Sequence, residues 1–214
     1  MMAAPSPLPP PRHAGPGAHP GTHPGVGLVP IRSLGIDDRA ALLEHFLALQ
    51  AEDRYLRFGY AATDRQIARY VGGIDFARDE VFGVFDRRLR LVAVAHLAMG
   101  EAHAGQAEFG VSVLPAGRGR GIGTRLFERA AMFARNRGLH SLRLQCLSEN
   151  VAMMGIARRA GMHVRNCGSE TDALLEIPPR SLLSHLDEWL RDAAAALDFA
   201  IKLGLHRPQG PGAD

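Results

Sequence analysis

The sequence predicts a mixed α/β fold, in which helices cover a mostly antiparallel sheet that also contains one parallel strand pair. Two apolar segments, 81–85 and 89–97, flank a short polar turn and are typical of a β-hairpin. Within residues 107–127, the apolar spacing changes from two residues to nearly four across four glycines, which indicates a strand, a turn and a helix. The next strand is expected at 141–146, and a strand–helix–strand link of this kind requires its two strands to run parallel.

The N-terminal residues 1–26 differ in composition from the rest of the chain. They are mainly Pro, Gly, Ala and His with almost no large apolar side chain, so they cannot bury enough surface to offset the entropy of ordering. We therefore expect a disordered tail. The folded domain is expected to span 27–178 and to begin with a strand at 27–32, in which Pro30 indicates an edge position.

Two helical segments are expected after the first strand. Asp37 or Asp38 can cap the first, and the second begins near Thr63-Asp64. The apolar stripe of the first helix consists of Leu42, Leu43, Phe46 and Leu49. Residues 53–58 lie between the helices and are expected to form a loop, whose aromatic side chains either line a groove or pin the loop to the core.

The rest of the domain alternates strands with helices. The expected elements are a strand at 105–114, a helix at 119–137, a strand at 141–146, a helix at 151–160, and a hairpin of strands 162–167 and 172–177. Gly138 and Gly161 follow the two helices and suit the left-handed position that ends a helix. The helix at 151–160 is apolar on most sides, so we expect it to be mostly buried.

Beyond Pro178-Pro179, residues 179–205 are expected to form an amphipathic helix, and residues 206–214 a second disordered tail. The apolar stripe of this helix is wide. It consists of Leu182, Leu183, Leu186, Trp189, Leu190, Ala193, Leu197 and Ile201. Such a stripe must be covered, either by the domain itself or by a second subunit, so a homodimer through this helix is one expectation.

Composition excludes several classes of function. The 214-residue chain has a formal charge of +3 and a pI of about 9.3, but its basic residues are nearly all arginine and are scattered, so we expect no nucleic-acid surface. No apolar run approaches the roughly 18 residues that span a bilayer, and the N-terminus lacks the features of a signal peptide. The two cysteines have no zinc-binding spacing. A cytoplasmic protein without a metal or a membrane partner is expected.

The glycine-rich segment 118–123, Arg-Gly-Arg-Gly-Ile-Gly, falls at the start of the expected helix 119–137. Backbone N–H groups at a helix start bind anions, and glycines allow a bulky group to approach closely. A P-loop needs Lys followed by Ser or Thr after its last glycine, and Thr124-Arg125 stand there instead. The dinucleotide fingerprint would need Gly at 124 or 126, where Thr and Leu stand. An arginine-rich turn or an RNA-binding run is the alternative interpretation.

The pattern R-x-x-G-x-G directly after a strand resembles the pyrophosphate loop of the GNAT superfamily of acyl-CoA N-acyltransferases. The element order over residues 27–178 is also similar to the GNAT fold, whose sheet is splayed between its fourth and fifth strands. Within the superfamily, the chain looks closest to bacterial protein-lysine acetyltransferase domains that act on acetyl-CoA synthetase. The segments that carry this closer resemblance are Tyr55–Phe58, Ala107–Phe109, Ser148–Asn150, Met153-Met154 and Ala160–Met162.

The resemblance implies acetyl-CoA as co-substrate, with no metal. The backbone from Gly119 to Thr124 would hold the pyrophosphate, and Arg118 and Arg120 would add charge at the rim. Asn150 would orient the thioester; it could also be a helix cap, and the two roles are compatible. The pantetheine arm would lie along Val111 to Val113. The implied binding residues are Val111, Ser112, Val113, Arg118, Gly119, Arg120, Gly121, Ile122, Gly123, Thr124 and Asn150.

Two residues are candidates for proton transfer. Glu108 shares one face of its strand with Gly110 and Ser112, and it matches a glutamate of related enzymes, so we expect a general base that acts directly or through water. A solvated residue or an ion pair with an arginine is the alternative. The tyrosine that many family members use as general acid is missing, so Ser148, water or unassisted departure of the thiolate remains, and Ser148 could instead cap a helix. An acyl intermediate on Cys146 ranks low, because it lacks a base partner.

The expected activity is direct transfer of acetyl from acetyl-CoA to a primary amine, with a protein lysine as acceptor. Two alternatives remain: a small amine such as a polyamine or an aminoglycoside as the acceptor, and a non-catalytic acetyl-CoA sensor. Residues 53–70 contain more arginine than acidic residues, which disfavours cationic small acceptors.

Overall fold

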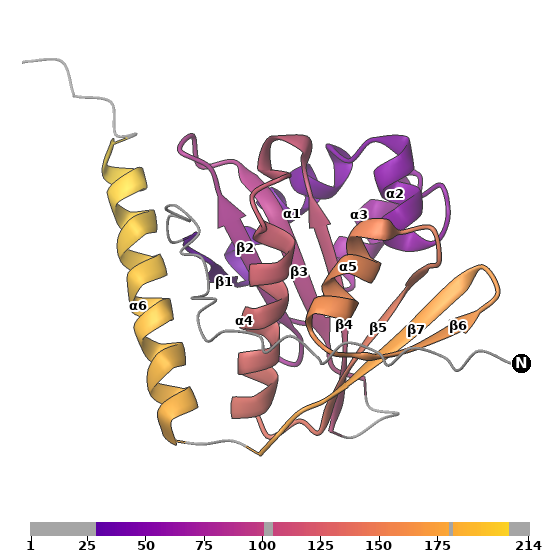
Figure 1. Cartoon of the computed structure of the whole chain (residues 1–214). Helices are drawn as coiled ribbons and strands as arrows, with labels where there is room; N and C mark the ends of the chain where they lie inside the picture. Colours follow the sequence, from indigo (N-terminus) through magenta and orange to yellow (C-terminus); the bar gives the residue numbers. More distant parts are fainter. Residues whose placement is uncertain (1–28, 101–104, 180–181, 206–214) are drawn as a thin grey trace, which may run out of the picture.

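A seven-stranded sheet organises the chain, of which the computed structural model describes residues 29–100, 105–179 and 182–205 (Figure 1). The strands are β1 (Arg32–Leu34), β2 (Glu80–Phe85), β3 (Leu91–Ala98), β4 (Gln106–Val113), β5 (Ser141–Leu147), β6 (His163–Cys167) and β7 (Glu170–Glu176). The helices are α1 (Arg39–Leu47), α2 (Ala51–Phe58), α3 (Asp64–Gly72), α4 (Ile122–Asn136), α5 (Val151–Arg159) and α6 (Leu182–Leu205), with short 3-10 turns η1 (Ile36–Asp38) and η2 (Pro115–Gly117). Within the described ranges, no helix has the length and hydropathy needed to cross a membrane.

The strands lie in the order β1-β2-β3-β4-β5-β7-β6, and all neighbours pair antiparallel except β4 and β5. The parallel pairing of β4 with β5 covers Gln106–Glu108 against Ser141–Arg143. Beyond Glu108 the register with β5 ends, while β4 stays paired with β3 as far as Val113. The predicted mixed fold, with a mostly antiparallel sheet splayed between its fourth and fifth strands, is confirmed.

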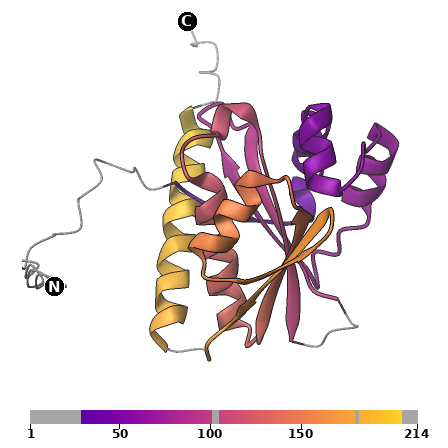
Figure 2. The same cartoon turned by 45° about the vertical axis from the view of Figure 1, so that its right-hand side comes forward.

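Helices cover both faces of the sheet. Figure 2 shows α1, α2 and α3 on one side and α4, α5 and α6 on the other. Each side has its own apolar core, because alternate residues of the central strands point to opposite faces. Phe109 of β4 packs edge-on against Phe127 of α4, with ring centroids 5.1 Å apart, whereas Val94 of β3 joins the core beneath α1 and α3. The buried helix predicted at 151–160 is α5, and it contributes four buried apolar residues.

Three local predictions in the N-terminal part are wrong. The first strand is β1, which begins at Arg32, and residues 29–31 form no strand. Asp38 precedes α1 but does not cap it, because its carboxylate accepts hydrogen bonds from the Gly35 N–H and from Arg32. Residues 53–58 form most of helix α2 rather than a loop.

Helix α2 was missed because it has only eight residues and none of them is buried, so its apolar periodicity is too short to stand out in the sequence. Its end signals are nevertheless regular: Glu52 and Asp53 lie in the first turn, where acidic groups complement the helix dipole. Gly59 ends it in the left-handed conformation, at φ +78°.

The C-terminal helix α6 is present, but the apolar stripe faces away from the domain from Trp189 onwards. The described part of the stripe includes Trp189, Leu190, Leu197 and Ile201, which are 65%, 53%, 64% and 55% exposed. The opposite face packs on the domain, through residues that include the buried Ala195. We expected either the domain or a second subunit to cover the stripe. The domain does not cover these four residues. Residues 1–26 and 206–214, expected to be disordered tails, lie outside the described residues.

Buried Arg129 of α4 explains this orientation. Its guanidinium donates to Glu188 at 2.7 Å and to Asp192 at 2.6 Å, and its side chain is only 3% exposed. Asn136 of α4 also donates to Glu188. A buried cation is costly without paired carboxylates, so these contacts turn the acidic face of α6 inward and its apolar face outward.

Candidate active site

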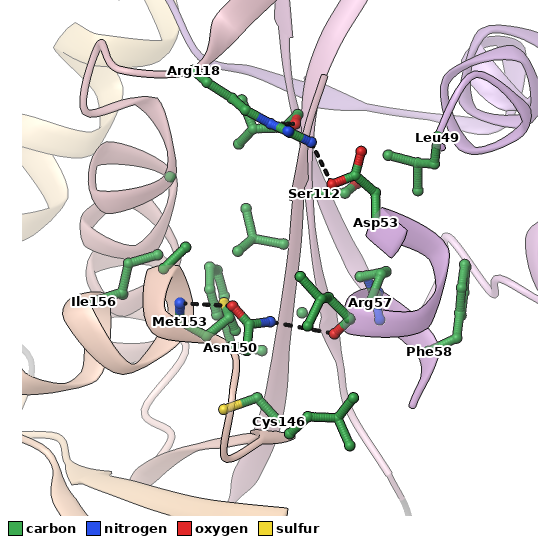
Figure 3. Close-up of a pocket in the computed structure, with 18 of the residues that line it drawn as sticks. Leu49, Asp53, Arg57, Phe58, Ser112, Arg118, Cys146, Asn150, Met153 and Ile156 are labelled. Atoms are coloured by element: carbon green, nitrogen blue, oxygen red, sulfur yellow. Dashed lines mark hydrogen bonds and ion pairs between the residues drawn. The ribbon is translucent and has the colours of Figure 1, made fainter. Parts of the chain in front are cut away.

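A cavity of about 850 Å³ opens where β4 and β5 diverge, between helix α2 on one side and α4 with α5 on the other (Figure 3). The structure brings most of the predicted site residues to its wall. These are Glu108, Val111, Ser112, Val113, Arg118, Gly119, Gly121, Ile122, Gly123, Thr124 and Asn150. Two predicted residues, Arg120 and Ser148, do not line it. Arg120 instead lines a second hollow, between the glycine loop and α6.

The glycine loop places the N-terminus of α4 in the cavity wall. Gly119 and Gly121 have φ of +72° and +69°, a conformation that side-chain-bearing residues rarely adopt. The buried Ile122 anchors the first turn of α4, and the first hydrogen bond that returns to the loop is from Arg125 N to Gly121 O. The N–H groups before Arg125 therefore lack partners in the helix and can bind an anion.

Arg118 lines the cavity and reaches from the glycine loop to helix α2. Its Nε donates to the Val113 carbonyl at 3.0 Å, and its Nη2 forms an ion pair with Asp53 of α2. Figure 3 shows this pair spanning the opening. The arginine thus links the glycine loop to a helix that sequence analysis did not connect with the loop.

Asn150 joins the two sides of the cavity. Its Oδ1 accepts from the Met153 N–H at 3.1 Å and so caps α5, while its Nδ2 donates to the Leu56 carbonyl of α2 at 3.3 Å (Figure 3). The helix-cap interpretation is therefore confirmed, and the amide remains in the cavity wall between β5 and α2.

Glu108 is the last residue of β4 that pairs with β5, and its side chain is exposed. Among the described residues it forms no ion pair, and Arg143, which faces it in the register, pairs with Asp172 instead. Of the two structural alternatives left open for Glu108, the solvated carboxylate fits and the ion pair does not. An exposed carboxylate beside the cavity is accessible both to water and to an incoming amine.

Ser112 is buried and bonded to a residue that sequence analysis missed. Its Oγ lies 2.8 Å from Nε2 of His45, whose Nδ1 lies 2.9 Å from the Leu91 carbonyl. A carbonyl only accepts, so we assign the proton to Nδ1, and Ser112 then donates to Nε2. Burial lowers the pKa of His45 to about 4, so the ring is neutral at pH 7. His45 follows Leu42 by three residues on the apolar stripe, which is the signal that could have revealed it.

Ser148 lies outside the cavity, so its two predicted roles are not supported. Its hydroxyl donates to the Gly168 carbonyl at 3.1 Å and lies 3.0 Å from the Thr171 hydroxyl, while Asn150 caps α5. Of the alternatives predicted for the general acid, two remain: water protonates the leaving thiolate, or the thiolate departs without assistance. Cys146 does line the cavity, but burial raises the pKa of its thiol, which disfavours the nucleophilic thiolate.

The cavity carries charges of both signs. Among the described residues, its wall holds four carboxylates and three guanidinium groups: Glu52, Asp53, Glu108 and Glu170, with Arg57, Arg118 and Arg159. The composition of residues 53–70 therefore misrepresents the charge that an acceptor would meet, and it does not disfavour a cationic amine.

Comparison with known proteins identifies the family. The model of the acetyltransferase (GNAT) family matches residues 41–162. A comparison with curated protein sequences found no match.

Three solved structures illustrate the structural similarity. The GNAT domain of S. lividans PAT is 22% identical, with a TM-score of 0.58 over 68% of this chain and 89% of that one. Spermidine N-acetyltransferase from Vibrio cholerae, solved with CoA and spermine, is 18% identical, with a TM-score of 0.55 over 69% and 94%. A mutant of the cAMP-binding acyltransferase from Mycobacterium smegmatis is 22% identical, with a TM-score of 0.51 over 80% of this chain and 52% of that one.

At these identities the structural similarity shows the fold, whereas the family model covers more than half of the chain together with the glycine loop and β4. Members of this family use acetyl-CoA, and the anion-binding helix start described above suits its pyrophosphate. The chain therefore belongs to the GNAT acetyltransferase family and is a GNAT-type N-acetyltransferase.

Proposed function

We propose that the protein transfers acetyl from acetyl-CoA to the side-chain amine of a protein lysine by direct attack. One observation carries this proposal: a single cavity joins the anion-binding start of α4 to the exposed carboxylate of Glu108, across the gap between β4 and β5. A donor held at one end of this cavity would bring its thioester towards the carboxylate at the other.

The residues present fit acetyl-CoA. The free N–H groups at the start of α4 suit the pyrophosphate. Beyond Glu108, the edge of β4 that β5 leaves free can pair with the amides of the pantetheine arm, although the Val113 carbonyl is engaged by Arg118. Asn150, fixed by its two hydrogen bonds, would orient the thioester from the opposite wall.

Glu108 would remove the proton of the attacking amine, directly or through a water molecule. Transfer to an ammonium group needs such a route, because only the neutral amine is a nucleophile. Exposure at the end of the β4–β5 pairing leaves the Glu108 carboxylate accessible from the side on which α2 lies.

The lysine acceptor is supported by the resemblance of Tyr55–Phe58, Ala107–Phe109 and Ser148–Asn150 to bacterial protein-lysine acetyltransferase domains. A small amine is the alternative, and the structural similarity to a spermidine N-acetyltransferase favours it. The setting that we propose is the cytoplasm, and it agrees with Cys146 and Cys167 being free thiols.

The test is release of CoA thiol from acetyl-CoA by the purified protein, with lysine-bearing proteins, polyamines and aminoglycosides as separate acceptors. Glu108→Gln should cut the rate and leave CoA affinity unchanged. Glu52→Gln, which removes an exposed carboxylate elsewhere on the cavity wall, should do neither. Equal rates for wild type and Glu108→Gln would remove Glu108 as the base. Binding of acetyl-CoA without transfer to any acceptor would favour the sensor.

We also propose that the outward stripe of α6 pairs with the same stripe of a second copy. Residues 206–214 contain no large apolar side chain and residues 1–28 contain few, so neither segment can cover it. A self-complementary apolar face suits a twofold interface. Light scattering should show a dimer that becomes a monomer in Leu190→Glu/Leu197→Glu, and a monomeric wild type would contradict this.

A further inference from the structure

One arginine of the cavity wall, Arg57, is fixed in place without a counter-charge. Four arginines lie within residues 53–70, and of these only Arg57 lines the cavity. Arg54 is bonded to Asp64 and to three backbone carbonyls. Arg65 and Arg69 are exposed on α3. Arg57 is thus the cation of this segment that an acceptor in the cavity would meet.

The guanidinium of Arg57 lies against the backbone of β4 at Gly110. A Cβ atom added at Gly110 would lie 2.6 Å from Nη2 and 2.8 Å from Cζ of Arg57, so glycine is required for this approach. The guanidinium carbon also lies 5.3 Å and 5.4 Å from the ring centres of Phe58 and Tyr70. These contacts hold the group in one place on the acceptor side of β4.

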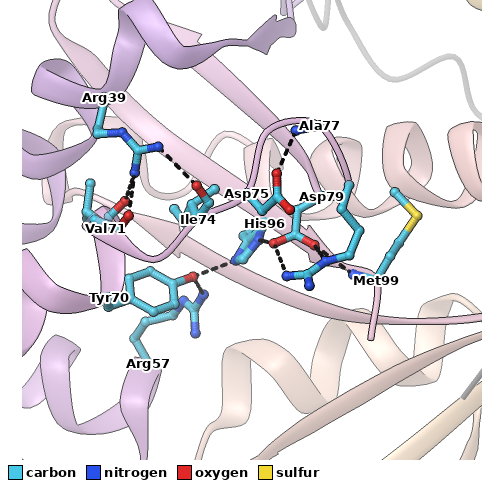
Figure 4. A network of polar contacts seen from close by, with 12 residues as sticks. Arg39, Arg57, Tyr70, Val71, Ile74, Asp75, Ala77, Asp79, His96 and Met99 are labelled. Carbon is cyan, nitrogen blue, oxygen red and sulfur yellow. Dashed lines mark hydrogen bonds and ion pairs between the residues drawn. The ribbon is translucent and has the colours of Figure 1, made fainter. Parts of the chain in front are cut away.

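A directed chain of hydrogen bonds fixes Arg57 further (Figure 4). Its Nη2 donates to the Tyr70 hydroxyl at 2.7 Å. The Tyr70 hydroxyl oxygen lies 2.8 Å from Nδ1 of His96, and Nε2 of His96 lies 3.2 Å from the Asp79 carboxylate. Burial would raise the pKa of Asp79, but hydrogen bonds from Arg78, the Met99 N–H and His96 lower it below its usual value. The ionised carboxylate only accepts, so His96 donates to it and accepts from Tyr70. The Tyr70 oxygen is then left to accept from Arg57.

This arrangement leaves most donors of Arg57 unused. Its Nε is buried and has no hydrogen-bond partner, and among the described residues Arg57 forms no ion pair. Its aromatic contacts stabilise the cation, but it lacks the paired carboxylate that a partly buried arginine normally has. Glu108 lies two residues from Gly110 on the same face of β4, about 7 Å along the strand.

We propose that Arg57 selects acceptors that carry a carboxylate close to the reacting amine. This deepens the proposed function and rests on it: while the amine is at Glu108, a neighbouring carboxylate of the acceptor reaches the guanidinium over Gly110. The planar fork of arginine suits a carboxylate, which can accept two parallel hydrogen bonds. In a protein acceptor this describes a lysine with an acidic side chain beside it.

Matched lysine peptides test the proposal. Both peptides of a pair contain a single lysine and are identical except at one position, where one has Glu and the other Gln. This position runs, from pair to pair, from two residues before the lysine to two after it. For at least one pair, the wild type should favour Glu in kcat/KM by roughly tenfold or more, as expected for a hydrogen bond to a charged group. Equal kcat/KM for Glu and Gln in every pair, with measurable transfer, would overturn the proposal and leave the proposed function standing.

Three variants separate selectivity from a structural effect. Arg57→Gln removes the charge, and Gly110→Ala keeps it but displaces the guanidinium, so either should abolish the preference for Glu. Arg69→Gln removes an arginine charge outside the cavity and should leave the preference for Glu unchanged. A merely structural role of Arg57 would lower both peptides of a pair equally and would overturn the proposal. Absence of transfer to every peptide, despite acetyl-CoA binding, would overturn the proposed function and this inference together.

Discussion

Acid should destabilise the protein through His45, a buried neutral histidine beside the cavity. Its pKa is lowered to about 4, chiefly by burial; the hydrogen bond to the Leu91 carbonyl opposes this, and the charge of Arg57 adds to it. The unfolded chain has a histidine pKa near 6.5, so between pH 6.5 and 4 it binds a proton that the folded state does not. Stability is therefore full above pH 6.5 and is lost as the pH falls towards 4.

The magnitude follows from these two pKa values. Between pH 7.5 and 5.0, protonation of the unfolded state at this one site lowers the free energy of unfolding by about 2 kcal/mol. Urea denaturation at the two pH values measures it, with His45→Gln as the variant without a titrating ring. The wild type should lose about 2 kcal/mol more than the variant over this interval. Replacement of the exposed His163 by Gln serves as the control and should not change the loss. Equal losses for wild type and His45→Gln would refute a neutral, buried His45.

Three further predictions concern residues whose contacts the structure defines. Ser148→Ala should leave kcat within about twofold of the wild type, because Ser148 lies outside the cavity; a larger loss of CoA release would restore it as an acid. Arg129→Met should lower the free energy of unfolding in urea by about 3 kcal/mol or more, because two carboxylates of α6 lose their buried cation; an unchanged midpoint would mean that α6 is held otherwise. Asp53→Asn should tighten CoA binding by up to about fivefold in calorimetry, because the pyrophosphate would no longer compete with Asp53 for Arg118. Weaker binding would show that Asp53 positions Arg118 for the ligand.

Local patterns predicted the central part of the fold. Three features could be recognised from residues adjacent in sequence: the alternation in β4, the glycines before α4 and the left-handed Gly138 after it. The structure confirms all three. The same holds for the glycine loop of the candidate site, because a turn and the helix after it are read from adjacent positions. The loop reaches the cavity because β5 parts from β4 after Glu108, so residues 109–113 and the loop that follows them line the gap.

Contacts between distant residues could not be predicted in this way. His45 meets Ser112 across 67 positions, and Arg129 meets Glu188 across 59. The second pair decides between the two coverings that the sequence left open for the stripe of α6. A buried arginine is costly without paired carboxylates, so the acidic face of α6 turns towards the domain. Ser148 was misplaced for a related reason. It belongs to the turn contacts between β5 and β7, and no residue near it in sequence shows that.

Strand β4 has two faces with different consequences for substitution. Phe109 packs on α4, and a Cβ added at Gly117 of the glycine loop would lie 3.1 Å from the Val113 side chain, so the odd-numbered face supports the helix and loop that would bind the donor. Glu108, Gly110 and Ser112 face the other way, where Gly110 meets Arg57 and Ser112 meets His45. Changes at Phe109 and Val113 should therefore reduce stability and CoA affinity together, whereas changes at Glu108 and Gly110 should alter proton transfer or acceptor choice. A one-residue deletion within the strand would exchange the faces and abolish both.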